Sequence, residues 1–132
     1  MPIEVSWLVP GRVVLARGYG IVTRDENTES DRLVMQYIDR GTPPVHVIID
    51  VTPVDDFPMY TAQEEIQKSR EFLKHQQLGW GILCGTSNPV VRFLVSIVTR
   101  ISRVNFRMFE NYDEALQFLK EHDQSINLEI SK

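Results

Sequence analysis

The chain has little of the chemistry that small proteins use for covalent stability or metal binding. Only one of its 132 residues, Cys84, is a cysteine, so no disulfide can form within the chain. Cys84 lies in an apolar stretch, where buried thiols are usually inert. The sequence has no Cys-x-x-Cys or His-Glu-x-x-His motif, and its three histidines are scattered. Zinc chemistry and a nucleophilic triad therefore have no support, and we expect neither a metal nor a cofactor.

Long hydrophobic runs and a basic excess are also missing. The longest apolar-rich stretch, "VVRFLVSIVTRI", is interrupted by two arginines and is too short to span a bilayer. The N-terminus has no basic segment followed by an apolar one, so we expect no signal peptide. The net charge of −4 argues against nucleic acid as a partner, because phosphate binding needs a basic surface. We expect a cytoplasmic protein, since one thiol suits a reducing compartment.

The sequence does have a regular alternation of strand and helix signals. Strands are predicted at 3–8, 12–20, 44–51, 79–85 and 104–109, and helices at 23–41, 61–77, 89–103 and 112–122. The order is β-β-α-β-α-β-α-β-α. It predicts an α/β fold in one domain, residues 1–122, with a mixed β-sheet that begins as an antiparallel hairpin and continues in parallel βα units. Residues 123–132 form a C-terminal tail for which the sequence shows no partner.

Several segments resemble a STAS domain, the fold of sporulation-type anti-anti-sigma factors. The segments "GRVVLARGYG", "VHVIIDVT", "LGWGILCGTSNPVVRFLVSIVTRISRVNFRMF" and "NYDEALQFLKEH" are similar to the SpoIIAA-like group. The resemblance covers Ile3 to His122. The fold of this group is also compared with the CRAL-TRIO lipid-binding domain. The resemblance implies a STAS-like regulatory or binding domain rather than an enzyme.

The loop after the central strand, "DVTPVDDFPMYT", is the main candidate site. In STAS regulators, as the resemblance implies, a serine or threonine of this loop accepts a phosphate from a partner kinase. Thr52 and Thr61 are the hydroxyls available here. A phosphate adds nearly two negative charges, and a helix N-terminus can hold it. The loop departs from the family pattern, because the serines and the glycine expected after the aspartate, here Asp50, are missing.

Two other interpretations of this loop stay open. Thr61, with Glu64 three residues on, has the spacing of a helix capping box, and Thr52-Pro53 suits a plain turn. Alternatively, the loop carboxylates gather at the edge of the sheet where α/β proteins bind ligands, and three of them could hold Mg²⁺ or Ca²⁺. The residues of this loop site are Asp50, Asp55, Asp56 and Tyr60.

The helix predicted at 89–103 is more apolar than one buried face requires. Its apolar residues cover an arc of roughly 200°, whereas a surface helix needs a stripe only a little wider than about 100°. Val91, Val95 and Val98 point sideways from the face that would pack on the sheet. They are either covered by the last helix or the tail, or they form a face for a second copy, a protein partner or an apolar ligand.

These observations lead to one expected function and one alternative. We expect a non-enzymatic regulatory or protein-interaction domain that resembles anti-sigma factor antagonists, with an anti-sigma-factor-like kinase or another regulator as partner. The alternative is a binder or carrier of a lipid or other apolar small molecule, as the CRAL-TRIO comparison implies. An enzyme that uses the loop carboxylates lacks a recognisable base or nucleophile. The tripeptide Gly18-Tyr19-Gly20 is interpreted as a strand end, not as a dinucleotide-binding motif.

Overall fold

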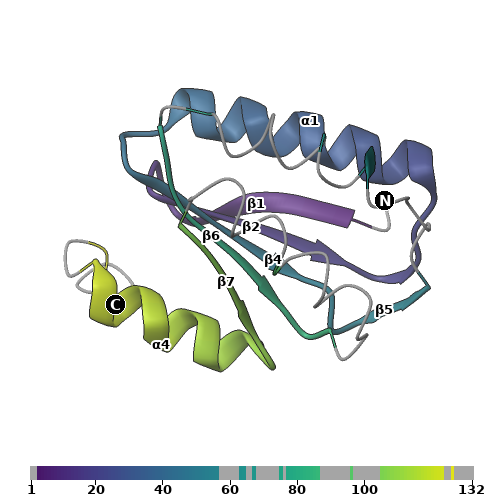
Figure 1. The fold of residues 1–132 in the computed structure, drawn as a ribbon. Coiled ribbons are helices and arrows are strands. Elements are labelled where there is room, and N and C mark those ends of the chain that lie inside the picture. The colour runs from purple at the N-terminus through teal and green to yellow at the C-terminus, as the bar shows by residue number, and fades with distance from the viewer. Residues whose placement is uncertain are drawn as a thin grey trace.

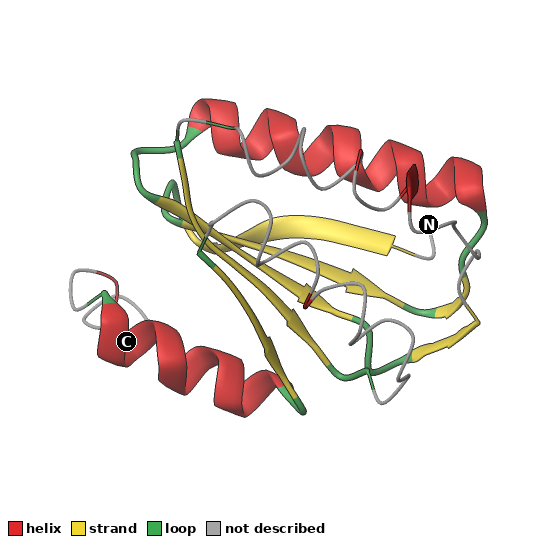
Figure 2. Cartoon of the chain, viewed as in Figure 1, coloured by secondary structure: helices red, strands yellow, loops and turns green. Residues whose placement is uncertain are grey.

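The structure is a computed structural model that describes residues 3–56, 63–64, 67, 75, 77–86, 96, 105–123 and 126. Its centre is a five-stranded sheet with the order β1-β2-β4-β6-β7. Figures 1 and 2 show helix α1 (Arg24–Arg40) along one face of this sheet and helix α4 (Tyr112–His122) along the other. The strands are β1 (Ile3–Val9), β2 (Val13–Gly18), β4 (Val45–Asp50), β6 (Leu78–Cys84) and β7 (Phe106–Phe109).

The directions of the strands agree with the sequence pattern. β1 pairs antiparallel with β2, and β2, β4, β6 and β7 are mutually parallel. The predicted mixed sheet with an N-terminal antiparallel hairpin is therefore confirmed, with "VHVIID" as the central strand. Because neighbouring parallel strands end on the same side, the carboxyl ends of β2, β4 and β6 share one edge of the sheet.

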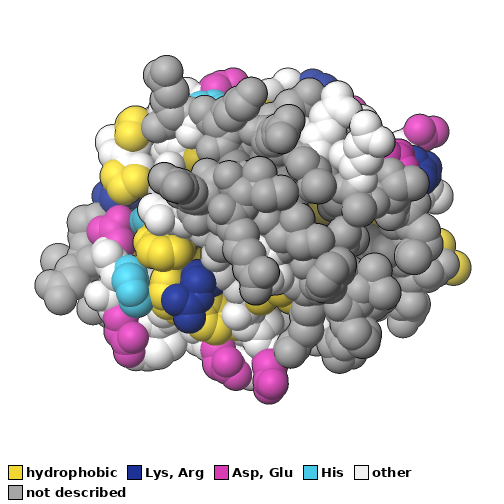
Figure 3. Space-filling model, in the orientation of Figure 1, with side chains coloured by type: hydrophobic (Ala, Val, Ile, Leu, Met, Phe, Trp, Pro, Cys, Tyr) yellow, Lys and Arg dark blue, Asp and Glu magenta, His cyan; other side chains and the backbone are white. Residues whose placement is uncertain are grey.

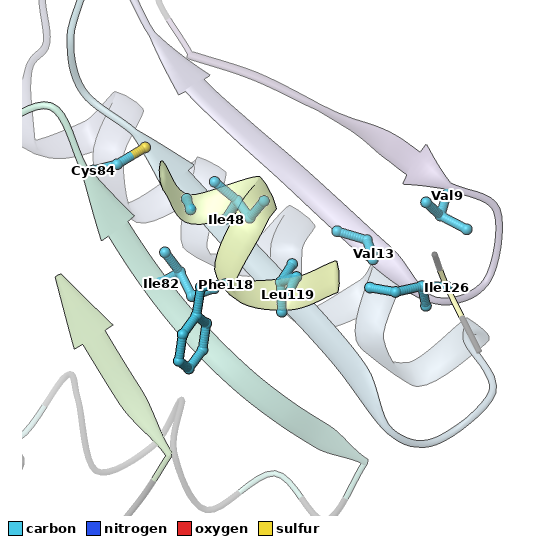
Figure 4. Close-up of a cluster of buried hydrophobic side chains, with 9 residues drawn as sticks. Val9, Val13, Ile48, Ile82, Cys84, Phe118, Leu119 and Ile126 are labelled. Atoms are coloured by element: carbon cyan, nitrogen blue, oxygen red, sulfur yellow. The ribbon is translucent and has the colours of Figure 1, made fainter. Parts of the chain in front are cut away.

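The core has two layers because successive side chains of a strand point to opposite faces of the sheet. In β4, Val47 packs in the cluster that holds Val34 and Ile38 of α1. The next residue, Ile48, packs in the cluster that holds Leu119 of α4. Figure 4 shows this second cluster, which is built from Val9, Val13, Ile48, Ile82, Cys84, Ala115, Phe118, Leu119 and Ile126.

The helix α1 (Arg24–Arg40) begins and ends at clear local signals. The Thr23 hydroxyl accepts a hydrogen bond from the Glu26 amide at 3.2 Å, and the Glu26 carboxylate accepts one from the Thr23 amide at 3.0 Å. This reciprocal capping box satisfies two amides that have no partner within the helix. Gly41 follows the last turn, as predicted, and its amide donates to Ile38.

The predicted start of helix α4 (Tyr112–His122) is also confirmed. The Asn111 side chain accepts a hydrogen bond from the Glu114 amide at 2.9 Å. Ala115 and Leu119 are buried, as the predicted inner face requires. This helix places the side chains of its first turn beside the carboxyl edge of the sheet.

Two short strands that the predicted order lacks form a second sheet. β3 (Gly20–Ile21) pairs in parallel with β5 (Val54–Asp56). The second predicted strand therefore ends at Gly18, and part of the predicted loop after Asp50 is strand. Segments this short carry no readable periodicity, so only the pairing between distant parts of the chain creates them.

The predicted tail begins with two residues that contact the core. Asp123 forms hydrogen bonds to Arg12 and His46, and Ile126 is completely buried in the cluster of Figure 4. The helices predicted at 61–77 and 89–103 lie mainly outside the described residues, although Gln63, Glu64, Gln67 and Ser96 are helical. Within the described part of the chain, no helix is long and apolar enough to cross a membrane.

Candidate functional site

An open pocket of about 440 Å³ lies at the carboxyl edge of the sheet. Open α/β sheets bind their ligands at this edge, because loops from neighbouring strands converge there. The end of β2, the end of β4 with the turn after it, and the first turn of α4 meet around the pocket. Its lining residues are Arg17, Tyr19, Asp50, Thr52, Pro53, Asn111, Tyr112 and Asp113.

Asp50 is the central polar residue of this site, and both of its carboxylate oxygens are hydrogen-bonded. Arg17 donates from Nε to Asp50 Oδ2 at 2.9 Å. Thr52 donates to Oδ1 twice, from its amide at 3.0 Å and from its hydroxyl at 2.7 Å. The three residues therefore form one connected unit that holds the turn after β4 against the end of β2.

The ionised form of Asp50 is the stable one in this unit. Its side chain is only 5% exposed, and burial alone would raise the pKa of the carboxyl group. The hydrogen bonds from Thr52 and the charge of Arg17 outweigh burial, so the pKa of Asp50 is lowered from its usual 3.8. Asp50 thus carries a negative charge at neutral pH that Arg17 neutralises.

The cysteine at the end of β6 is not reactive. Cys84 is fully buried next to Asp50. Burial and, after it, the charge and hydrogen bond of Asp50 raise the pKa of Cys84 to about 12. Because only the thiolate is a nucleophile, this thiol stays unreactive at neutral pH.

Arg17 is held on a second side by an aromatic ring. The centre of its guanidinium group lies 5.0 Å from the centroid of the Tyr112 ring, within the range of a cation–π interaction. Tyr19 lines the same pocket as Arg17. Burial lowers the pKa of Arg17, but the hydrogen bond and the charge of Asp50 outweigh burial and raise it. Arg17 is therefore a fixed cation that links β2, β4 and α4.

Gly85 allows the turn after β4 to approach the end of β6. It has a φ of 91°, and a Cβ atom at this position would lie 2.1 Å from the Thr52 hydroxyl oxygen and 2.6 Å from the Thr52 amide nitrogen. Val51 also donates its amide to the Cys84 carbonyl at 3.0 Å. A side chain at Gly85 is excluded both by its backbone conformation and by this contact.

The structure brings together part of the predicted loop site. Asp50 and Thr52 are in direct contact and line the pocket, and Asp55 and Asp56 belong to β5. Among the described residues, no group of three or more His, Cys, Asp or Glu side chains could hold a metal ion. The other predicted site residues, Tyr60, Thr61, Val91, Val95 and Val98, lie outside the described residues.

A buried polar cluster lies at the opposite edge of the sheet, and it was not predicted from the sequence. The His46 ring, 3% exposed, accepts a hydrogen bond from the Trp80 amide at its Nδ1 and hydrogen-bonds Asp123 through Nε2 at 2.8 Å. The acceptor at Nδ1 places the proton on Nε2, so His46 is neutral and donates to Asp123. Arg12 pairs with the same carboxylate at 3.0 Å. A histidine within "VHVII" was the available signal, since a buried polar side chain needs partners.

The architecture defines the class of fold before any comparison: an α/β domain with a mixed sheet, an N-terminal hairpin and a polar pocket where the parallel strands end. Several solved structures share this architecture, including the two that follow. An uncharacterised protein of the DUF3478 family with a SpoIIAA-like fold, from Shewanella loihica PV-4, has a TM-score of 0.60 and 16% identity, over 89% of this chain and 91% of that one. The anti-sigma factor antagonist SpoIIAA in its unphosphorylated form has a TM-score of 0.58 and 14% identity, over 90% and 96%.

These matches confirm the predicted fold: the chain has a SpoIIAA-like fold. No protein-family model matches the sequence, and no curated protein matches it either. At 14–16% identity the likeness to the two solved structures concerns the fold, so the function has to be argued from the site.

Proposed function

We propose that this protein is a non-enzymatic regulatory domain that binds a protein partner at the carboxyl edge of its sheet, around the pocket between β2, β4 and α4. The observation that carries the proposal is the state of Asp50. Both oxygens of this buried carboxylate accept hydrogen bonds and its charge is neutralised by Arg17. Asp50 therefore has a structural role in the surface around the pocket, because its occupied carboxylate is not free to act as a general base.

The other reactive side chains near the sheet support the same proposal. The thiol of Cys84 is buried, and its pKa is raised to about 12 by burial and by Asp50. The lone pair on Nδ1 of His46 is occupied by the Trp80 amide. General acid–base catalysis needs a group that can exchange a proton with substrate, and these two groups cannot reach one. An open, polar pocket suits recognition of another protein better than enclosure of a lipid.

The proposal includes a regulatory step at Thr52. A kinase partner would transfer the terminal phosphoryl group of a nucleoside triphosphate to the Thr52 hydroxyl oxygen, with the diphosphate as leaving group, and the phosphate would replace the hydrogen that now bonds to Asp50 at 2.7 Å. The nearly two added charges would then stand beside the Asp50 carboxylate and compete for Arg17. Phosphorylation of Thr52 would therefore open the Arg17–Asp50–Thr52 unit and change the surface that the partner meets.

Site-specific photo-crosslinking tests partner binding. A benzoylphenylalanine is placed at Tyr19, which is 40% exposed at the pocket, and the variant is produced in cells of the source organism. The control carries the same group at Glu121, an exposed residue near the other end of α4. We expect one protein adduct at Tyr19 and not at Glu121. The captured protein, once purified, must bind the unmodified chain, and Tyr19→Ala must weaken that binding. Equal adducts at both positions, or none, would contradict the proposal.

Native mass spectrometry of the chain isolated from those cells tests the regulatory step and the alternatives. We expect a species heavier by one phosphate, mapped to Thr52 and absent from Thr52→Val. A phosphate mapped elsewhere would contradict the role of Thr52. A monomer that carries a lipid-sized mass would favour the carrier of an apolar ligand, and a dimer would favour a second copy as the partner.

A further inference from the structure

The charged groups around the pocket differ in whether they are already paired. Arg17, the basic side chain of the lining, donates from Nε to Asp50 and packs one face of its guanidinium group on the Tyr112 ring. An anionic ligand would have to compete with Asp50 for this cation. Because the Arg17–Asp50 pair is neutral as a whole, it contributes little net charge to the pocket.

The negative charge of Asp113 is available in the same pocket. Asp113 lies in the first turn of α4, lines the pocket and is exposed. Among the described residues, Asp113 takes part in no hydrogen bond or ion pair, whereas its neighbour Glu114 is engaged with Asn111. Figure 3 shows acidic side chains along the lower rim of the molecule, over the start of α4. Among the described residues that line the pocket, the unpaired charge is therefore negative.

Tyr19 also lines the pocket, and a glycine stands on either side of it in the chain. A Cβ atom at Gly18 would lie 2.6 Å from the Val54 side chain, so the chain can pack on β5 only with a glycine there. Gly20 has a φ of 59°, which turns the backbone into β3 directly after Tyr19. The Tyr19 side chain remains 40% exposed. An exposed aromatic ring near a carboxylate is suited to a cation, because the ring face and the carboxylate both attract positive charge.

From these three observations we infer that the pocket receives a positively charged side chain, lysine or arginine, of the protein partner. The inference rests on the proposed function and names the chemistry that the partner must present. The cation pairs with Asp113, and its alkyl stem and charged head pack on Tyr19. The Gly18-Tyr19-Gly20 tripeptide thereby has a role beyond ending a strand: it presents the tyrosine to the partner.

Nuclear magnetic resonance titration of the ¹⁵N-labelled full chain tests this inference. The probes are three blocked peptides that differ at one residue: acetyl-Leu-Arg-Leu-amide, its citrulline counterpart and its glutamate counterpart. Citrulline has nearly the shape of arginine without its charge. We expect the arginine peptide to shift the amide signals of Tyr19, Thr52 and Asp113. The citrulline peptide should bind about fivefold more weakly, and the glutamate peptide should leave these signals in place.

Variants of the carboxylates supply the matched controls. Asp113→Asn should weaken binding of the arginine peptide about fivefold, Asp113→Glu should restore it, and Glu121→Gln, which removes a charge at the far end of α4, should not change it. Unchanged spectra outside the pocket verify that each variant is folded. Equal binding of the arginine and citrulline peptides, preference for the glutamate peptide, or no shift at all would overturn the inference. Spermidine binding as tightly as the arginine peptide would also overturn it, in favour of a free polycation. The Tyr19 crosslink would stand in all these cases, so failure here is distinct from failure of the proposed function.

Discussion

Arg17 and Asp50 are direct register partners at the ends of two neighbouring parallel strands, β2 and β4. Their side chains meet at 2.9 Å between Nε and Oδ2, with Asp50 5% and Arg17 31% exposed. In its degree of burial the pair is intermediate between two kinds of salt bridge. A surface salt bridge contributes little to stability, whereas the loss of one partner of a buried salt bridge leaves an unpaired charge. The same pair neutralises the centre of the candidate site.

Removing one partner of this pair should destabilise the protein. Arg17→Met leaves the buried Asp50 carboxylate without its counter-charge, and we expect a loss of about 2 kcal/mol in the free energy of unfolding at pH 7. Urea denaturation followed by circular dichroism measures it. In the double variant with Asp50→Asn the loss should be smaller than the sum of the two single losses. Additive losses would show that the two side chains do not interact.

The effect of Arg17 should also depend on pH in a defined direction. Burial raises the pKa of Asp50, but the hydrogen bonds from Thr52 and Arg17 outweigh burial and lower the pKa below its usual 3.8. Its contribution to stability is therefore fully present above pH 3.8 and is lost as the pH falls through the folded-state pKa. The difference in the free energy of unfolding between the wild type and Arg17→Met should therefore become smaller as the pH falls below 3.8. A difference that stays constant over this acid range would contradict the assignment.

Alanine at Gly85 should displace the turn after β4, whereas alanine at Gly20 should leave that turn in place. Both glycines have a positive φ, but a Cβ at Gly85 would meet Thr52 at 2.1 Å and one at Gly20 would meet nothing within 4 Å. We expect about 1 kcal/mol of backbone strain for Gly20→Ala and at least about 2 kcal/mol more for Gly85→Ala. In a nuclear magnetic resonance spectrum of the ¹⁵N-labelled protein, the amide signal of Thr52 should shift in Gly85→Ala and not in Gly20→Ala. Similar losses for the two variants would mean that the turn after β4 adapts to the added methyl group.

The buried His46 should make stability fall between neutral and mildly acid pH. Burial, and to a lesser extent Arg12, lowers the pKa of His46 below 6.5, although Asp123 opposes the change. The stability that depends on the neutral ring is thus full above pH 6.5 and declines as the pH falls toward the folded-state pKa. His46→Asn should be less stable by about 2 kcal/mol at pH 7, because the bond to Asp123 is lost, and should lack this decline. His122→Gln, the control, should keep the decline. A wild-type protein with flat stability from pH 7 to pH 5 would refute the argument.

The segment after α4 should contribute to stability through Ile126. This side chain is completely buried in the cluster with Val9, Val13 and Leu119. Ile126→Ala should therefore cost about 2–4 kcal/mol in thermal or urea unfolding, as other buried Ile-to-Ala changes do. The control Ile21→Ala, at a side chain that is 69% exposed, should cost less than about 0.5 kcal/mol. Equal costs at the two positions would place Ile126 outside the cooperative core.

The elements of the fold could be predicted where a local signal encodes them. Asn111 and Glu114 lie three residues apart and form the predicted start of α4, and Gly41 follows α1 as predicted. The continuous apolar run of β4 indicated a central strand covered on both faces, and the packing of Val47 and Ile48 to opposite sides confirms it. Such signals act within one or two turns of chain, so a single sequence contains them in full.

The candidate site could be predicted only in part. Asp50 and Thr52 were identified because the resemblance implies an aspartate and a phosphate-accepting hydroxyl at the end of this strand and in the loop after it, and their hydrogen bonds are local. Arg17 was missed although it neutralises Asp50, because 33 residues separate the two in the chain. The β3–β5 pairing and the role of Gly85 were missed for the same reason: each depends on a close approach of segments whose distance in space the sequence does not state.

The sequence by itself determined the five strands of the main sheet, the helices α1 and α4, the mixed character of the sheet and the resemblance to a family, since periodicity, caps and turns are local properties. Only the tertiary structure decided which charges are paired and which are available. It joined Arg17 to Asp50, and it joined His46 to Asp123 across 77 residues, while Asp113 was left facing the pocket. The physical reason is that pairing and burial of charge depend on distances in space, and the sheet sets those distances by aligning distant strands in register.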